Sequence, residues 1–152
     1  MKPVTLVRMA AVFALIHAVL HTIGGVFGKI EAGPATVAVT AMKANRFLAF
    51  GTLRTFWDFY MGLGLGVTIF LTMEAMVLWF LAPLTATHDG KLRPPLAVFA
   101  IGYLTFAVDS FRYFFLGPVV VEILIAACLF AAVAAMRRDP MGSEPGRRLT
   151  EV

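Results

Sequence analysis

Four long apolar segments constrain the fold of this chain more than any other feature of its sequence. A helix needs about 20 mainly apolar residues to cross a bilayer, and such segments cover residues 9–28, 57–82, 95–115 and 118–136. The 152 residues are 60% hydrophobic and only 14% charged, and a small globule cannot bury so much apolar surface. The sequence therefore predicts an all-α fold, in which residues 1–136 form one bundle of four transmembrane helices.

The connections between these segments carry further structural signals. The first connection, residues 29–56, contains TVAVTAMKANRFLAF, which predicts a short helix lying in the membrane interface. LTATHDGKLRP, residues 84–94, is predicted to be a polar inner loop. The LGP sequence before the last segment predicts a tight helical hairpin with Pro118 at the first helical position. Residues 137–152 are rich in charge, Pro and Gly, which predicts a disordered cytoplasmic tail.

Lysine and arginine residues predict the orientation of these segments, because inner connections of membrane proteins are enriched in them. We expect both termini to lie in the cytoplasm, at a bacterial cytoplasmic (inner) membrane. Eight basic residues then lie inside (Lys2, Arg8, Lys91, Arg93, Arg137, Arg138, Arg147, Arg148) and five outside (Lys29, Lys43, Arg46, Arg54, Arg112). The start MKPVTLVR resembles that of a signal peptide, but two histidines in the apolar stretch favour a retained helix.

Those histidines open the question of function. His17 and His21 are four residues apart, so a helix places them on one face, which Gly24, Gly25 and Gly28 continue. Ionisable groups inside a bilayer are costly, and each is therefore a candidate functional residue. We predict a polar cluster in the outer half of the bundle: His17, His21, Asp58, Asp109, Arg112 and Glu122, with Arg54 beside it.

The residue types of this cluster are compatible with several kinds of site. His17 and His21 are candidate metal ligands that carboxylates from other helices would complete. Quinone binding, a proton relay and a single-histidine haem are alternatives. The contrasting interpretation is structural: hydrogen-bonded histidines within the packing, and helix-end ion pairs Arg54–Asp58 and Asp109–Arg112. We expect Cys128 to be a small packing residue, and no basic–aromatic pattern points to nucleic acid.

Two stretches, HAVLHTIGG and GTLRTFWDFYMGLGLG, belong to a layout that resembles small bacterial four-helix membrane proteins. In size, span count and the outward loop after the first helix, the chain is loosely similar to the DoxX-like group. That resemblance implies a link to quinone-dependent redox complexes of the membrane. Trp57 and Asp58 stand where that group has a glutamate near the start of the second helix, so no catalytic residue is carried over.

The sequence leaves three functional hypotheses open and does not decide whether the protein is an enzyme. The first is a non-catalytic subunit or accessory protein, whose partners are the lipid bilayer and other membrane subunits or a second copy of the chain. The second is a redox, quinone-binding or metal-binding membrane protein that uses His17, His21 and Asp109. The third is a small proton-coupled transporter with a path bracketed by Glu74 and Asp109. Base rates favour the first hypothesis. The third is disfavoured because four short spans leave little room for the inverted repeats that are common in transporters.

Overall fold

The computed structural model describes residues 1–87 and 89–136, and most of these residues are helical. The elements are α1 (Pro3–Leu20), a π-helical turn η1 (His21–Val26), α2 (Pro34–Ala44), β1 (Arg46–Ala49), β2 (Thr52–Thr55), α3 (Phe56–Leu84), α4 (Asp89–Tyr113) and α5 (Leu116–Ala135). The prediction of an all-α protein is confirmed, apart from the short β1–β2 hairpin. Four helical segments, which are α1 with η1, α3, α4 and α5, are long and apolar enough to cross a membrane. The predicted tail, residues 137–152, lies outside the described residues.

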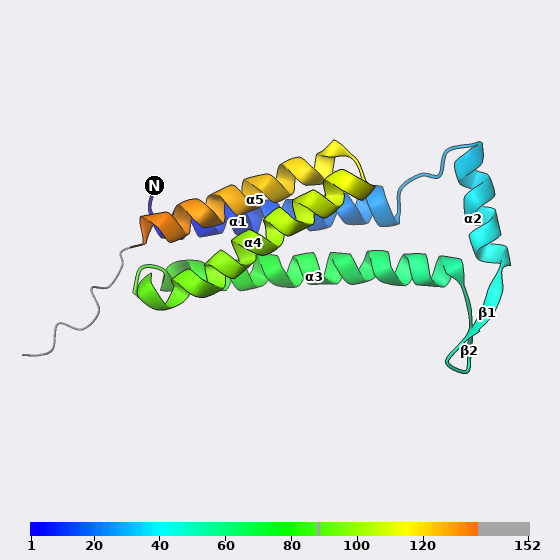
Figure 1. Cartoon of the computed structure of the whole chain (residues 1–152), viewed down its shortest axis with the longest axis horizontal. Coiled ribbons are helices and arrows are strands. Elements are labelled where there is room, and N and C mark those ends of the chain that lie inside the picture. Colours follow the sequence, from blue (N-terminus) through cyan, green and yellow to red (C-terminus); the bar gives the residue numbers. More distant parts are fainter. Residues whose placement is uncertain (88, 137–152) are drawn as a thin grey trace, which may run out of the picture. The chain divides into compact units, whose positions relative to one another are not determined.

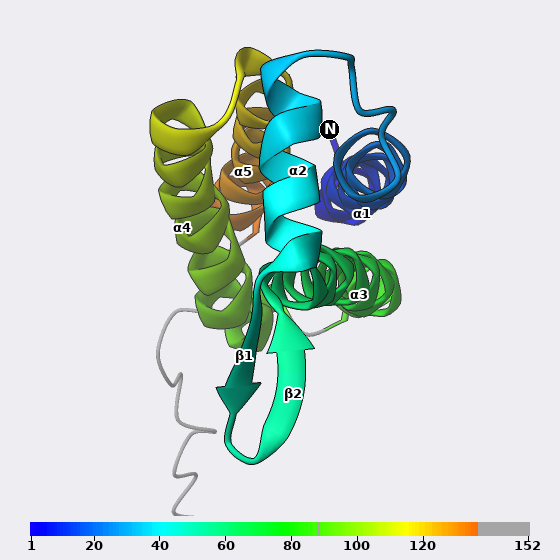
Figure 2. The same ribbon diagram turned by 90° about the vertical axis from the view of Figure 1, so that its right-hand side faces the viewer.

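The chain divides into two compact units. The first contains residues 1–10 and the chain from Leu78 onward, and the second contains Ala11–Val77. In the first unit, α4 and α5 lie side by side as a helical hairpin (Figures 1 and 2), as the LGP sequence predicts. Pro118 is the third residue of α5, not the first. It is still in the first turn, where a helix needs no backbone donor.

Buried positions recur along each long helix at alternating steps of three and four residues, the spacing of a single packed face. Small residues occupy many of these positions, and small side chains let helices approach closely. The buried residues are Leu6, Val7, Ala10, Ala11, Ala14, His17 and Ala18 in α1; Leu71, Ala75, Leu78 and Ala82 in α3; Leu96, Ala100, Tyr103, Ala107 and Ser110 in α4; and Val119, Glu122, Ile125, Ala126, Leu129 and Ala132 in α5.

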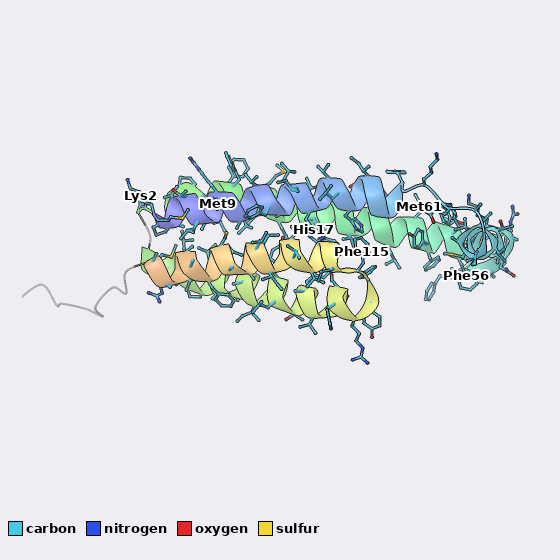
Figure 3. The ribbon with its side chains drawn as sticks, turned by 90° about the horizontal axis from the view of Figure 1, so that it is seen from above. Lys2, Met9, His17, Phe56, Met61 and Phe115 are labelled. Atoms are coloured by element: carbon cyan, nitrogen blue, oxygen red, sulfur yellow. The ribbon has the colours of Figure 1, made fainter. Side chains whose placement is uncertain are left out.

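The remaining faces of the same helices expose large apolar side chains, which project along their whole length (Figure 3). Phe70 and Phe80 in α3 are each 67% exposed, and Phe111 in α4 is 75% exposed. A water-soluble protein rarely exposes such a continuous apolar surface. Small residues inside and large apolar residues outside are instead the distribution that suits helices surrounded by lipid.

Two helix boundaries differ from the sequence-based expectation. Helix α1 begins at Pro3, before the expected Met9, because proline is preorganised for a first helical position. The guanidinium of Arg8 then lies 5.3 Å from the Trp79 ring centroid, a cation–π contact that lets a charge remain at the end of an apolar helix.

Helix α4 begins at Asp89, so the prediction of a loop was wrong for residues 89–94. There the Arg93 guanidinium donates to the Met136 carbonyl at 2.9 Å, which ties this end of α4 to the end of α5.

The first connection contains a helix and a hairpin, whereas the sequence predicted a helix through residues 36–50. Helix α2 ends at Ala44, and Asn45, in an extended conformation, leads into β1. β1 and β2 pair with Ala49 opposite Thr52, so Phe50 and Gly51 form a two-residue turn. Both turn residues have positive φ, +46° and +83°, as a type I′ turn requires. The sequence signal was missed because Asn or Asp usually stands where this chain has Phe50.

We expect Gly51→Ala to loosen the hairpin, because a Cβ at a φ of +83° is strained. A loss of about 1 kcal/mol in hairpin stability would raise the equilibrium constant for local opening of the hairpin roughly fivefold. Trypsin cleavage at Arg46 and Arg54 measures that opening, and the variant should be cut correspondingly faster. Gly102→Ala is the control, because its added Cβ meets no atom within 4 Å. Equal cleavage rates in both variants would contradict the assigned turn.

Candidate functional site: polar contacts within the helices

The six predicted site residues divide between the two units. His17, His21 and Asp58 belong to the unit of residues 11–77, and Asp109, Arg112 and Glu122 belong to the other. Their exposure differs as well. His17 and Glu122 are buried, His21 is half-buried, and Asp58, Asp109 and Arg112 are exposed. Each unit therefore presents its own set of polar contacts.

The second histidine lies where α1 changes its helical geometry. From His21 to Val26 the chain forms one π-helical turn, which ends with the Phe27 amide donating to the Thr22 carbonyl at 3.0 Å. A π-helical turn inserts an extra residue and rotates the side chains that follow, and such turns are frequent at functional sites. Here the turn sets the direction of His21 and Thr22, both of which contact α3.

A hydrogen bond joins His21 to the backbone of α3. The Nε2 atom of His21 lies 3.1 Å from the Gly64 carbonyl oxygen, and a carbonyl can only accept, so Nε2 carries the proton in this contact. One turn toward the start of α3, the Tyr60 hydroxyl donates to the Gly25 carbonyl at 3.3 Å. Side chains of each helix thus bind backbone carbonyls of the other.

Threonine side chains continue this contact along both helices. The Thr22 hydroxyl donates to the Ala18 carbonyl at 2.6 Å and lies 3.0 Å from the Thr68 hydroxyl. The Thr68 hydroxyl also lies 3.3 Å from the Gly64 carbonyl, and Thr72 donates to the Thr68 carbonyl at 2.8 Å. We call His21, Thr22, Tyr60, Gly64 and Thr68 the η1–α3 polar seam. Such bonds hold helices together where water does not compete.

Gly64 has a packing role that the other glycines near it lack. A Cβ on Gly64 would lie 3.1 Å from Val26 Cγ2, whereas one on Gly62 would meet nothing within 4 Å. The sequence places Gly24, Gly25 and Gly28 on the face of the histidines, and the structure gives a local reason for glycine at the last two positions. A Cβ on Gly28 would overlap the Gly24 carbonyl oxygen in the preceding π-helical turn, and one on Gly25 would press on the His21 ring.

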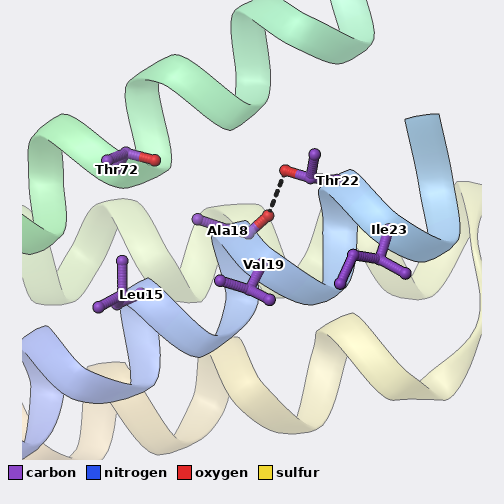
Figure 4. A pocket seen from close by; sticks show the side chains of 6 residues that line it. All are labelled: Leu15, Ala18, Val19, Thr22, Ile23 and Thr72. Carbon is purple, nitrogen blue, oxygen red and sulfur yellow. Dashed lines mark hydrogen bonds between the residues drawn. The ribbon is translucent and has the colours of Figure 1, made fainter. Parts of the chain in front are cut away.

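A shallow groove of about 200 Å³ lies beside the seam (Figure 4). It is lined by Leu15, Ala18, Val19, Thr22, Ile23 and Thr72. The Thr22 hydroxyl turns to the Ala18 carbonyl, so the lining is almost entirely apolar. A groove of this composition has no convergent polar groups with which to orient a polar substrate.

Asp58 caps the start of α3. Its carboxylate accepts from the Thr55 amide at 2.7 Å, while the Asp58 amide donates to the Thr55 hydroxyl at 3.1 Å. This reciprocal pair is a capping box. The sequence suggested an ion pair with Arg54, but the Arg54 guanidinium instead donates to the Leu53 carbonyl at 3.3 Å. Asp58 thus has a structural role that the Thr-x-x-Asp pattern could have revealed.

The other unit contains a buried carboxyl group. Glu122 of α5 is fully buried, and the Ser110 hydroxyl of α4 donates to its Oε1 atom at 2.8 Å. Asp109 and Arg112 are on exposed positions of α4, and the Arg112 guanidinium lies 5.9 Å from the Tyr113 ring centroid. Of the residues predicted for this cluster, Glu122 thus makes a buried contact with Ser110, while Asp109 and Arg112 stay exposed.

Sequence reasoning missed Ser110 as the partner of Glu122, and it missed the contact between Thr22 and Thr68 beside His21. The signal was present, because Gly64, Thr68 and Thr72 recur every four residues, the small-residue spacing of packed membrane helices. Within residues 1–87 and 89–136, no group of three or more His, Cys, Asp or Glu side chains is arranged to hold a metal ion. The hydrogen bonds described above can hold helices together. Each joins a donor to an acceptor or joins two hydroxyl groups.

A pair of glycine variants tests the seam. Gly64→Ala places a Cβ against Val26, while Gly62→Ala adds the same helix propensity without a contact. We expect the free energy of unfolding of Gly64→Ala to be about 1 kcal/mol lower than that of Gly62→Ala. Thermal unfolding in detergent measures the difference. Equal stability of the two variants would show that η1 and α3 are not close at Gly64.

A pair of hydroxyl variants tests the buried carboxyl contact. Ser110→Ala removes a donor from Glu122, and we expect a loss of about 1–3 kcal/mol of stability. Thr105→Ala is the matched control, because the Thr105 hydroxyl is exposed and donates to the Ile101 carbonyl of its own helix. Unfolding in detergent should separate the two clearly. If both lost the same small amount, the Ser110–Glu122 bond would have no role in stability.

No protein-family model matches the sequence, and neither the curated proteins nor the solved structures give a significant match. The similarity to the DoxX-like group therefore stays a prediction from the layout of the sequence. Any function assigned to the chain must rest on its own residues and on their contacts.

Proposed function

We propose that the chain is a multi-pass integral membrane protein whose four long helices cross the bilayer. The exposed apolar faces of these helices support the proposal, because lipid covers such surfaces and water does not. Aromatic residues at the helix ends add support, since tryptophan and tyrosine favour the membrane interface. Trp57, near the start of α3, stacks on Tyr60 with ring centroids 5.3 Å apart.

The balance of Lys and Arg favours an orientation with both termini in the cytoplasm, and the resemblance to small bacterial membrane proteins supports a bacterial inner membrane. In this orientation a tryptophan near each end of α3 contacts a basic side chain. Arg8 lies over Trp79 at the inner end, and the Lys43 ammonium lies 4.6 Å from the Trp57 ring centroid at the outer end. Helix α2, with no buried residue of its own, then belongs to the outer interface.

Within that membrane we assign the chain the role of a non-catalytic subunit or accessory protein. One observation carries this assignment: polar groups within the helices bind the protein itself. His21 binds the Gly64 carbonyl, and Ser110 binds Glu122. A polar group engaged in this way stabilises helix packing, whereas a catalytic group must be able to reach a substrate. The exposed predicted site residues Asp58, Asp109 and Arg112 lie near helix ends, where a partner subunit or lipid would meet them.

The assignment predicts how the histidines behave in the purified full-length protein. We expect His17→Ala and His21→Ala to lower the melting temperature in detergent, because each loses a packed polar side chain. We also expect elemental analysis and solvent extraction to find no stoichiometric metal or quinone that depends on these histidines. His88→Ala is the control, since it is the third histidine of the chain and lies outside the long apolar segments.

The opposite result would favour one of the other hypotheses. Stoichiometric metal, haem or quinone that disappears in His17→Ala or His21→Ala would replace the subunit assignment with a redox function. Proton-coupled flux in vesicles that disappears in Glu74→Gln would replace it with a transport function. Either finding overturns the proposal even if the variants also lose stability.

A further inference from the structure

The β1–β2 hairpin presents an unusual residue at its turn. Phe50 is fully exposed, and its φ of +46° lies in the left-handed region that a bulky residue rarely adopts. Leu48 and Leu53 form a cross-strand pair beside it and are 71% and 54% exposed. Paired residues share one face of a hairpin. The turn and this face therefore form one exposed apolar surface.

Aromatic contacts fix the hairpin to the start of α3. The Phe47 ring lies 4.7 Å from the ring centroid of Phe56 and 5.5 Å from that of Phe59. No residue separates β2, which ends at Thr55, from α3, which begins at Phe56. The hairpin and α2 run crosswise to α3, with the turn at the end far from α2 (Figures 1 and 2). If α3 crosses the bilayer, the hairpin thus lies along the membrane surface.

The charges of this segment have one sign. Between Glu31 and Asp58 the sequence contains no Asp or Glu, but it contains Lys43, Arg46 and Arg54. Arg46 shares the face of Leu48 and Leu53, two residues from Leu48 at the base of the hairpin. Basic residues beside exposed apolar side chains are typical of segments that bind the interface of a membrane containing anionic lipid.

We propose that the β1–β2 hairpin is a lipid anchor. Phe50, Leu48 and Leu53 enter the boundary between headgroups and acyl chains, and Arg46, Arg54 and Lys43 bind the phosphates of anionic lipids. The anchor holds the outer end of α3 at a fixed depth. This inference rests on the proposed membrane insertion of α3, and the experiment separates the two.

The test uses the full chain with Cys128→Ala, which removes its single thiol. One cysteine is then introduced in separate variants as Phe50→Cys, Thr52→Cys or Phe70→Cys, and is labelled with an environment-sensitive fluorophore. The protein is reconstituted in phosphatidylcholine vesicles with and without phosphatidylglycerol. Brominated lipid quenches labels in the membrane, and aqueous iodide quenches labels in water. Phe70 is exposed in the middle of α3, and Thr52 is exposed on the other hairpin face.

We expect brominated lipid to quench the label at position 50 about twofold more strongly than the label at position 52. Phosphatidylglycerol should increase the quenching at position 50, and Arg46→Gln with Arg54→Gln should remove that increase. The anchor is refuted if iodide quenches position 50 as strongly as position 52 while position 70 reports deep lipid. A hairpin that binds another protein would give that result. If position 70 is also quenched by iodide, the proposed membrane insertion itself is wrong.

Phe50→Asn keeps the turn geometry, because asparagine accepts positive φ, and it removes the apolar side chain. In this variant a label introduced by Leu48→Cys should lose its quenching by brominated lipid and become accessible to iodide. Unchanged quenching would show that Phe50 does not hold the hairpin in lipid.

Discussion

If the four long helices cross a bilayer, as proposed, a polar group inside one of them must find its hydrogen-bond partner within the protein, because lipid offers none. This constraint explains the contacts that hold the helices of each unit together. His21 donates to the Gly64 carbonyl, Thr22 meets Thr68, and Ser110 donates to Glu122. Hydrophobic side chains cannot give the same specificity, since they pack against lipid nearly as well as against another helix. Small residues on the buried faces bring the helices close enough for these bonds to form.

The four long helices could be predicted from sequence because a run of apolar residues is a local signal. The hairpin between α4 and α5 was predictable for the same reason, since Gly117 and Pro118 affect the conformation of the chain right next to them. The first connection was harder. The sequence from Thr36 to Phe50 has helical character throughout, but Asn45 ends the helix and Arg46 begins a strand that pairs with Thr55. Strand pairing across a turn depends on residues further along the chain.

The candidate site could be predicted only in part, because residue type does not reveal a partner. The histidines and carboxylates were identified, but the Gly64 carbonyl that binds His21 and the Ser110 hydroxyl that binds Glu122 were not. Asp58 shows the reason: its charge suggested an ion pair with Arg54, while the capping geometry directs it to the Thr55 amide. The π-helical turn at His21 also has no clear sequence signature, although it determines where His21 and Thr22 point.

The most direct test of this account is a double-mutant cycle between Thr22 and Thr68, with each residue replaced by valine. Valine preserves the shape of the side chain and removes only the hydroxyl group. Unfolding in detergent should give a coupling free energy of about 0.5–1 kcal/mol, the range of hydrogen bonds between membrane helices. A coupling of zero, with each single variant as stable as the parent chain, would contradict the claim that these polar groups hold the helices together.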